Sequence, residues 1–186
     1  MIDNFKPVEG HFKIEVINKD GVVIDSFEKH NLIMDKARKT FAKYIAGISG
    51  TNVINKLVLG TKGHIAGDIL APKDEAHGFV SSREMLFSEE TGTQGQDFEV
   101  LTFAPSGVSG DVVTCDDGFS TVKVTVIDTT TIYEINVHNT SANGDGTIIF
   151  TECALYTGDD IFSMRTFKGK IKDDSVSLRI TWKILF

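Results

Sequence analysis

The sequence predicts a mainly β protein that folds as an antiparallel two-sheet β-sandwich, of jelly-roll or immunoglobulin-like type, with one amphipathic helix. Three observations lead to this fold class. Most apolar residues lie in short runs with a period of two, which is typical of half-buried strands. Several connections between these runs are only three or four residues long, which favours antiparallel neighbours. Only one segment has a helical period. A β-barrel is the second architecture that fits the same pattern.

The first two strands are predicted to form a hairpin. Apolar residues alternate over residues 11–17, and a second strand is expected over residues 22–27. The turn between them is Asn18-Lys19-Asp20-Gly21, in which Asp-Gly is a strong hairpin signal.

The helix is predicted over residues 32–47, where apolar residues recur at intervals of three and four and lysines lie on the opposite face. Asn31 is the expected N-cap, because its short side chain can accept a hydrogen bond from the first turn. Gly47 or Gly50 is expected to end the helix, since glycine readily adopts the left-handed conformation found after many helices. A helix of this length can cover one face or one edge of a sheet.

Seven more strands are predicted in the rest of the chain, at residues 53–59, 97–103, 120–127, 131–137, 147–156, 161–167 and 176–186. The last of them alternates as far as Phe186. Chain ends often fray, so this pattern leads us to expect that Phe186 is paired and packed in the core. The polar stretches at residues 105–118 and 139–146 are expected to be solvated loops.

Residues 60–96 form a glycine-rich excursion without a regular period, and we expect a long loop there. Because loops of this length in compact domains are commonly functional, its apolar residues are our candidates for a protein interface. These candidates are Ile69, Leu70, Phe79, Val80, Met85, Leu86 and Phe87. Two interpretations remain open: the residues pack back on their own domain, or they anchor the loop in a neighbouring protein.

The chain of 186 residues is interpreted as a single β-sandwich domain, residues 1–186, that carries this excursion. Its formal net charge of -7 disfavours binding to nucleic acids or to anionic membranes. No apolar run approaches the length of about 18 residues that a membrane-spanning helix needs. The first residues lack the basic and then apolar pattern of a secretory signal, so we expect synthesis in a cytoplasm.

No motif in the sequence predicts catalysis. The five histidines have no metal-binding spacing, and the glycines after residue 59 do not form a phosphate-binding loop. No serine or cysteine lies in a nucleophile motif, and Cys115 and Cys153 are expected to be structural thiols. We therefore expect no enzymatic activity, no catalytic residue, and no bound cofactor or metal.

Three short elements follow one another in this chain: Asn31-Leu32-Ile33 before the helix, Leu59-Gly60-Thr61 in the next strand, and Trp182 near the end of the closing strand. In this order they resemble small virion proteins of tailed bacteriophages. The resemblance touches both ends of the chain and leaves about its middle third unmatched. It implies a non-enzymatic β-rich subunit located in the virion, at the neck or collar, at the tail, or on the capsid surface as a decoration. It also implies other virion structural proteins as partners, a homo-oligomer, and no nucleic-acid or membrane partner.

A carbohydrate-binding module for host attachment is the alternative function, because such modules use the same sandwich fold. They bind sugars with exposed aromatic side chains. The predicted loops contain Phe79, Phe87 and Phe119 but no tryptophan, and we expect Tyr133 and Trp182 in the core. An enzyme is a third class, which no constellation of residues supports.

Overall fold

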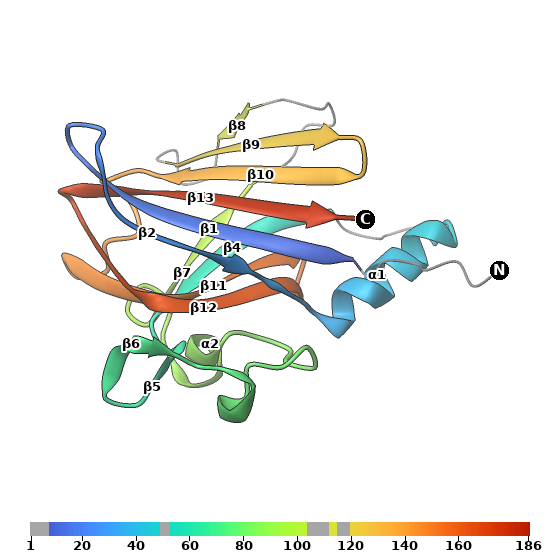
Figure 1. Cartoon of the computed structure of the whole chain (residues 1–186), viewed down its shortest axis with the longest axis horizontal. Helices are drawn as coiled ribbons and strands as arrows, with labels where there is room; N and C mark the ends of the chain where they lie inside the picture. The colour runs from blue at the N-terminus through green and yellow to red at the C-terminus, as the bar shows by residue number, and fades with distance from the viewer. Residues whose placement is uncertain (1–7, 49–52, 104–111, 115–119) are drawn as a thin grey trace.

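The computed structural model describes residues 8–48, 53–103, 112–114 and 120–186. It confirms the predicted fold class, because two antiparallel sheets pack face to face (Figure 1). The six-stranded sheet has the order β2 (Val23–His30), β1 (Glu9–Asn18), β13 (Val176–Leu185), β10 (Thr130–Val137), β9 (Ser120–Ile127) and β8 (Val112–Thr114). The five-stranded sheet has the order β3 (Leu32–Ile33), β12 (Asp160–Asp173), β11 (Thr147–Thr157), β4 (Ile54–Gly60) and β7 (Phe98–Thr102).

The predicted hairpin is confirmed. Strands β1 and β2 pair antiparallel, with a bulge between Val16 and Ile17. Gly21 has a φ of 78°, a left-handed value that glycine adopts without steric cost.

The helix forms, although it begins later than predicted. It is α1 (Asp35–Ile45), and the residues before it pair with β12 as the short strand β3. Asn31 is not the N-cap; its side chain is buried and donates a hydrogen bond to Ser163 in the five-stranded sheet. The N-cap is Met34, which forms no side-chain cap. Gly47 ends the helix as predicted, with a φ of 65° and its N–H bonded to the Tyr44 carbonyl.

The main core lies between the two sheets, and Trp182 is its largest side chain. This residue is 0% exposed, and its indole ring meets the ring of Phe12 edge-on at a centroid distance of 4.8 Å. Its Nε1–H donates to the hydroxyl of Ser163 at 3.2 Å, so the one polar atom of the buried indole has a partner. The alternation predicted for β13 is therefore correct for Trp182, which faces the core, and the polar residue Lys183, which faces solvent.

The prediction for the last residue is wrong. Strand β13 ends at Leu185, and Phe186 is 51% exposed. Its backbone N–H still donates to the Thr129 carbonyl, but its ring turns toward α1 and not into the core.

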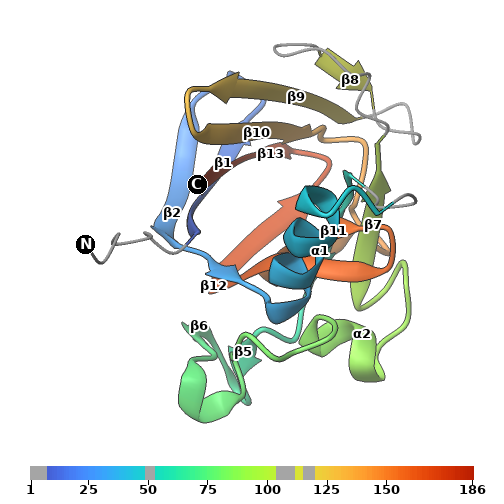
Figure 2. The same ribbon diagram turned by 90° about the vertical axis from the view of Figure 1, so that its right-hand side faces the viewer.

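Residues 60–96 are not a loop. They contain β5 (His64–Ile65), β6 (Asp68–Pro72), the 3-10 helix η1 (Glu75–His77) and α2 (Phe87–Thr91). Together these elements form a third layer over the outer face of the five-stranded sheet (Figures 1 and 2). A second apolar cluster lies beneath this layer, formed by Met34, Val58, Leu86, Phe87, Ala154, Tyr156, Ile161 and Met164.

The two segments expected to be solvated loops also differ from that expectation. Within residues 105–118, the structure describes 112–114, which pair with β9 as strand β8; the rest lie outside the described residues. In the segment 139–146, Ser141 is buried, and Asn139 and Asn143 supply oxygen atoms that bond the ammonium group of Lys172. A buried lysine needs such acceptors, and this requirement holds the segment against the sheet.

Replacing Trp182 with alanine is expected to lower the free energy of unfolding by about 3–5 kcal/mol, because it removes the largest core side chain and leaves a cavity. Chemical denaturation monitored by circular dichroism would measure this. Lys183→Ala, one residue away on the outer face, is the matched control and should change stability by less than about 0.5 kcal/mol. A Trp182→Ala loss as small as that of the control would contradict the assigned core position.

Candidate interaction surface

Helix α1 lies across one end of the sandwich, beside the last residues of β13 (Figure 2). Between the helix and the two sheets is a groove of about 430 Å³. Phe41, Tyr44 and Ile45 line its helix side, and Ile184 and Phe186 line its sheet side. We call this surface the α1 groove.

The groove exists because the sheets cover only the first part of the apolar stripe that predicted the helix. Ile33 and Ala37 are buried at the start of the stripe. Tyr44 and Ile45, about two turns after Ala37, are 57% and 90% exposed. Exposed apolar residues that gather in one place are typical of interaction surfaces.

The walls of the groove are aromatic and held in place. The ring of Phe41 is edge-on to those of Phe162 and Phe186, with centroid distances of 5.3 Å and 5.0 Å. Such pairs add about 0.5–1.5 kcal/mol beyond the burial of their area. Tyr133 also lines the groove, and burial raises its pKa to about 12, so its hydroxyl stays neutral at physiological pH. None of the described side chains that line the groove is charged, so it suits an apolar ligand surface.

The seven predicted interface residues do not form one surface. Leu86 and Phe87 are 0% and 7% exposed within the second cluster, and Phe79 packs against it. For these three residues, the first interpretation holds: they pack back on their own domain. The ring of Phe87 is further held by Arg83 and Lys73, whose cationic groups lie 3.6 Å and 3.8 Å from its centroid.

The other predicted interface residues remain accessible. Ile69, Leu70 and Met85 are 40%, 61% and 39% exposed, and Val80 is partly buried beside the cleft under η1. An interface role remains a prediction for these four residues.

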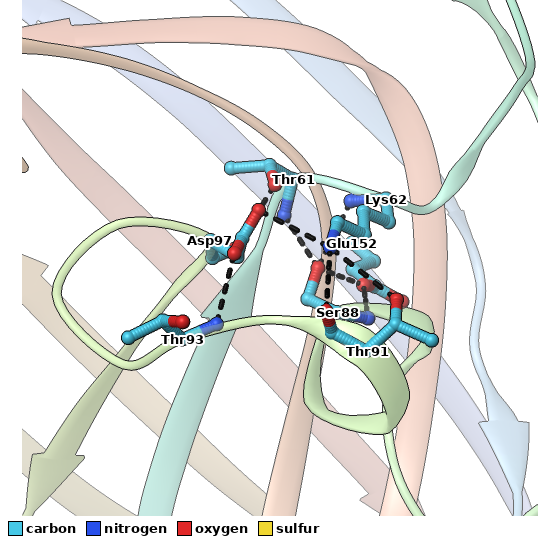
Figure 3. Close-up of polar contacts among 7 residues, drawn as sticks. All are labelled: Thr61, Lys62, Ser88, Thr91, Thr93, Asp97 and Glu152. Atoms are coloured by element: carbon cyan, nitrogen blue, oxygen red, sulfur yellow. Dashed lines mark hydrogen bonds and ion pairs between the residues drawn. The ribbon is translucent and has the colours of Figure 1, made fainter.

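A buried carboxylate from the five-stranded sheet holds the first turn of α2 (Figure 3). Glu152 on β11 accepts the N–H of Phe87 at 3.0 Å, the N–H of Ser88 at 2.7 Å and the hydroxyl of Ser88 at 2.5 Å. The Ser88 oxygen accepts the N–H groups of Thr61 and Lys62 at 2.8 Å and 2.9 Å. Ser88 is 0% exposed and its hydroxyl is fully used, so it links the third layer to the end of β4.

This arrangement gives a reason for the glycine in Leu59-Gly60-Thr61. A Cβ atom on Gly60 would lie 2.6 Å from the Ser88 hydroxyl and 2.7 Å from the Glu152 carboxylate. Any larger residue would therefore displace the Ser88 and Glu152 side chains, whose hydrogen bonds hold α2 on the sheet.

Asp97 and Lys62 close the other end of the third layer. Asp97 accepts the N–H of Thr93 at 2.8 Å and pairs with Lys62 at 3.2 Å. The hydrogen bond from Thr93, followed by that from Lys62, lowers the pKa of Asp97. The ammonium group of Lys62 also donates to the Thr91 carbonyl at 3.2 Å. Residues near the start and near the end of the segment 60–96 are therefore joined to each other (Figure 3).

The described residues contain no group of three or more histidine, cysteine or acidic side chains that could hold a metal ion. Among them, no helix combines the length and apolar character needed to cross a membrane. Cys153 is fully buried, and burial raises the pKa of its thiol; Cys115 lies outside the described residues. No protein-family model, no curated protein and no solved structure matches the chain.

The sequence contained no signal that separates the groove residues from core residues. Phe41, Tyr44 and Ile45 follow the same period as Ala37, and only the position of the sheets decides which of them is covered. For the third layer a signal did exist, in the apolar run Leu57-Val58-Leu59. Both faces of this strand are apolar, which is typical of a strand covered on both sides.

We expect Glu152→Gln to destabilise the protein at neutral pH by about 1–3 kcal/mol, because the amide leaves the Phe87 or Ser88 N–H without an acceptor. Desolvation raises the folded-state pKa of Glu152 above its ordinary value of 4.5. The stability of the wild type relative to the variant should therefore be greatest below pH 4.5 and fall as pH rises through the folded-state pKa.

Urea denaturation of both proteins at a series of pH values would test this dependence. Glu84→Gln is the control, because Glu84 is largely exposed and pairs only loosely with Lys36, at 3.8 Å. If the stability of the wild type relative to Glu152→Gln increased with pH, the prediction would be wrong. The hydrogen bonds donated to the Glu152 carboxylate would then lower its folded-state pKa by more than desolvation raises it.

Proposed function

We propose that this protein is a non-enzymatic structural subunit that binds neighbouring proteins through the α1 groove. The observation that carries the proposal is the uncharged, aromatic-walled groove at the end of a rigid sandwich, with Ile45 90% exposed at its rim. The resemblance of three short elements to virion proteins of tailed bacteriophages supports a place in such a particle, at the neck, tail or capsid surface. The neighbours would then be other virion structural proteins.

The energetics of the groove suit an assembly better than an isolated strong complex. Full burial of a side chain such as Ile45 or Phe186 contributes about 1.5–3 kcal/mol. Association costs about 4–15 kcal/mol in lost translational and rotational freedom. Two or three anchors in this groove therefore give weak binding by themselves. Repetition of the contact in a multi-subunit particle raises the effective concentration and makes such a contact sufficient.

A carbohydrate ligand fits the groove less well. Sugars need several hydrogen-bonding groups around an aromatic platform. Beside the buried Tyr133 hydroxyl, the polar groups that line the groove are the hydroxyls of Thr40, Tyr44, Thr131 and Thr157. The groove therefore favours a protein neighbour with apolar side chains, and glycan binding is the alternative that the experiment below distinguishes.

The test is incorporation of Ile45→Asp into the particles of a bacteriophage that carries this gene. A charge at the rim of the apolar groove should weaken binding by about 10- to 100-fold and deplete the protein from purified particles. Quantitative mass spectrometry of the particles would measure this depletion. Ala42→Asp adds the same charge on an exposed residue of the same helix that does not line the groove, and should be incorporated normally.

Two results would contradict the proposal. One is incorporation of Ile45→Asp at the wild-type copy number. The other is absence of the wild-type protein from the particles together with selective binding on a glycan array, which would favour the host-attachment module.

A further inference from the structure

A second apolar surface lies at the tip of the β1–β2 hairpin. Val22, Val23 and Ile24 are consecutive and are 55%, 43% and 57% exposed. Val23 and Ile24 begin β2, which is an edge strand of the six-stranded sheet, and Val22 immediately precedes it. Sheet edges with exposed aliphatic residues tend to associate with another chain unless they are protected.

The tip is rigid before anything binds it. The side-chain oxygen of Asn18 accepts the N–H groups of Asp20 and Val22, at 3.1 Å and 2.9 Å. The backbone of Asn18 also bonds to Gly21 and Val22, both at 3.0 Å. Four hydrogen bonds therefore fix the turn that presents the aliphatic residues. A preorganised tip loses little conformational entropy when it docks.

The tip and the α1 groove lie at opposite ends of the long axis of the molecule (Figure 1). Strand β1 connects the two ends: Glu9 pairs with Leu185 beside the groove, and Asn18 pairs with Val176 beside the tip. A strand of 10 residues spans about 30 Å. The tip of a molecule therefore cannot reach its own groove, whereas it can reach the groove of another copy.

The charges at the two ends are of opposite sign. Four of the 19 basic residues and only one of the 26 acidic residues lie in α1. Among the described residues, Arg38, Lys39 and Lys43 form no ion pair, while Asp159 and Asp160 at this end are paired with Lys56 and Lys36.

At the hairpin end, Asp20 lies in the β1–β2 turn, and Asp173 and Asp174 lie at the neighbouring turn between β12 and β13, where Lys19 interacts with Asp173. Charges of opposite sign attract a hairpin end to an α1 end and disfavour contacts between two like ends.

We infer that the occupant of the α1 groove is the β1–β2 hairpin tip of a second copy of this chain. This inference rests on the proposed function and names the neighbour that the groove binds. Val22, Val23 and Ile24 enter the groove against Tyr44 and Ile45. The contact joins two different surfaces, so it is heterologous and repeats from copy to copy, closing into a ring or continuing as a filament.

The test uses two variants of the full-length protein, each defective at one end. Ile45→Asp places a charge in the α1 groove, and Ile24→Asp places a charge on the hairpin tip. Both residues are exposed, so neither change should disturb the fold. Light scattering and analytical ultracentrifugation over a wide concentration range should show that the wild type associates and that each variant alone is monomeric. Each change is expected to weaken association by about 10- to 100-fold.

Mixing the two variants is the decisive step. Each mixture has one intact groove and one intact tip, so an equimolar mixture should form a dimer of twice the chain mass of 20.4 kDa and nothing larger. Ala42→Asp and Ser26→Asp, which add the same charge to exposed residues of α1 and β2 outside the two surfaces, should associate as the wild type does. Raised salt should weaken all of these complexes, since it screens the opposite end charges.

A wild type that stays monomeric at every concentration overturns the inference, as does an Ile24→Asp variant that associates normally. Neither result affects the proposed function if Ile45→Asp is still depleted from particles, because the groove would then bind a different virion protein. Circular dichroism and thermal unfolding of each variant would show that a loss of association does not arise from a loss of folding.

Discussion

Both faces of the five-stranded sheet must be covered, because its central strands are apolar on both sides. In β4, Leu57 and Leu59 face the cluster between the sheets while Val58 faces the opposite side. Strand β11 repeats the pattern with Leu155 inward and Tyr156 outward. The six-stranded sheet covers the inner face and residues 60–96 cover the outer one (Figure 2), with Glu152 fixing the start of α2 in place. A segment without visible periodicity is therefore an integral layer, since its removal would expose an apolar sheet face to water at about 25 cal/mol per Å².

The parts of the fold that the sequence predicted are those determined by local patterns. Period-two alternation located nine of the 13 described strands, and the Asp20-Gly21 signal located the hairpin, because a strand with one covered face and a tight turn each impose their own residue types. The strands that it missed are β3, β5, β6 and β8. The third layer was not predicted, because nothing near Leu86 and Phe87 in the sequence shows what they pack against. Their buried positions can be understood only once the outer face of the five-stranded sheet is known to be apolar. The N-cap was wrong for a similar reason: burial of Asn31 against Ser163, a residue distant in the sequence, outweighed its local preference for a helix start.

Helix α1 shows why the surface that we propose for partners is difficult to distinguish from a core in the sequence. Its apolar stripe continues past the point where the sheets end, so Ala37 is buried and Ile45 is 90% exposed within one periodic pattern. An interface that is covered only in an assembly selects the same residue types as a core. The distinction lies in what the rest of the fold leaves uncovered. Phe186 is a second example of an apolar position that looks like core in the sequence. It continues the alternation of β13 and yet lines the α1 groove.

The pairing of β1 with β13 makes the two ends of the molecule one mechanical unit. Ten residue pairs in unbroken register run from Glu9 and Leu185 to Asn18 and Val176. Phe12 and Trp182 meet within this ladder, so the largest core side chain lies between the α1 groove and the hairpin tip. A two-stranded ladder buried at its centre resists bending, and close-packed cores transmit displacement rather than absorb it. The groove and the tip therefore keep a constant separation and orientation, and successive copies joined through them would repeat with one fixed geometry. A subunit of a regular particle needs such a fixed separation between its two contact surfaces. The packed interior of the sandwich provides this fixed separation, and neither surface does so by itself.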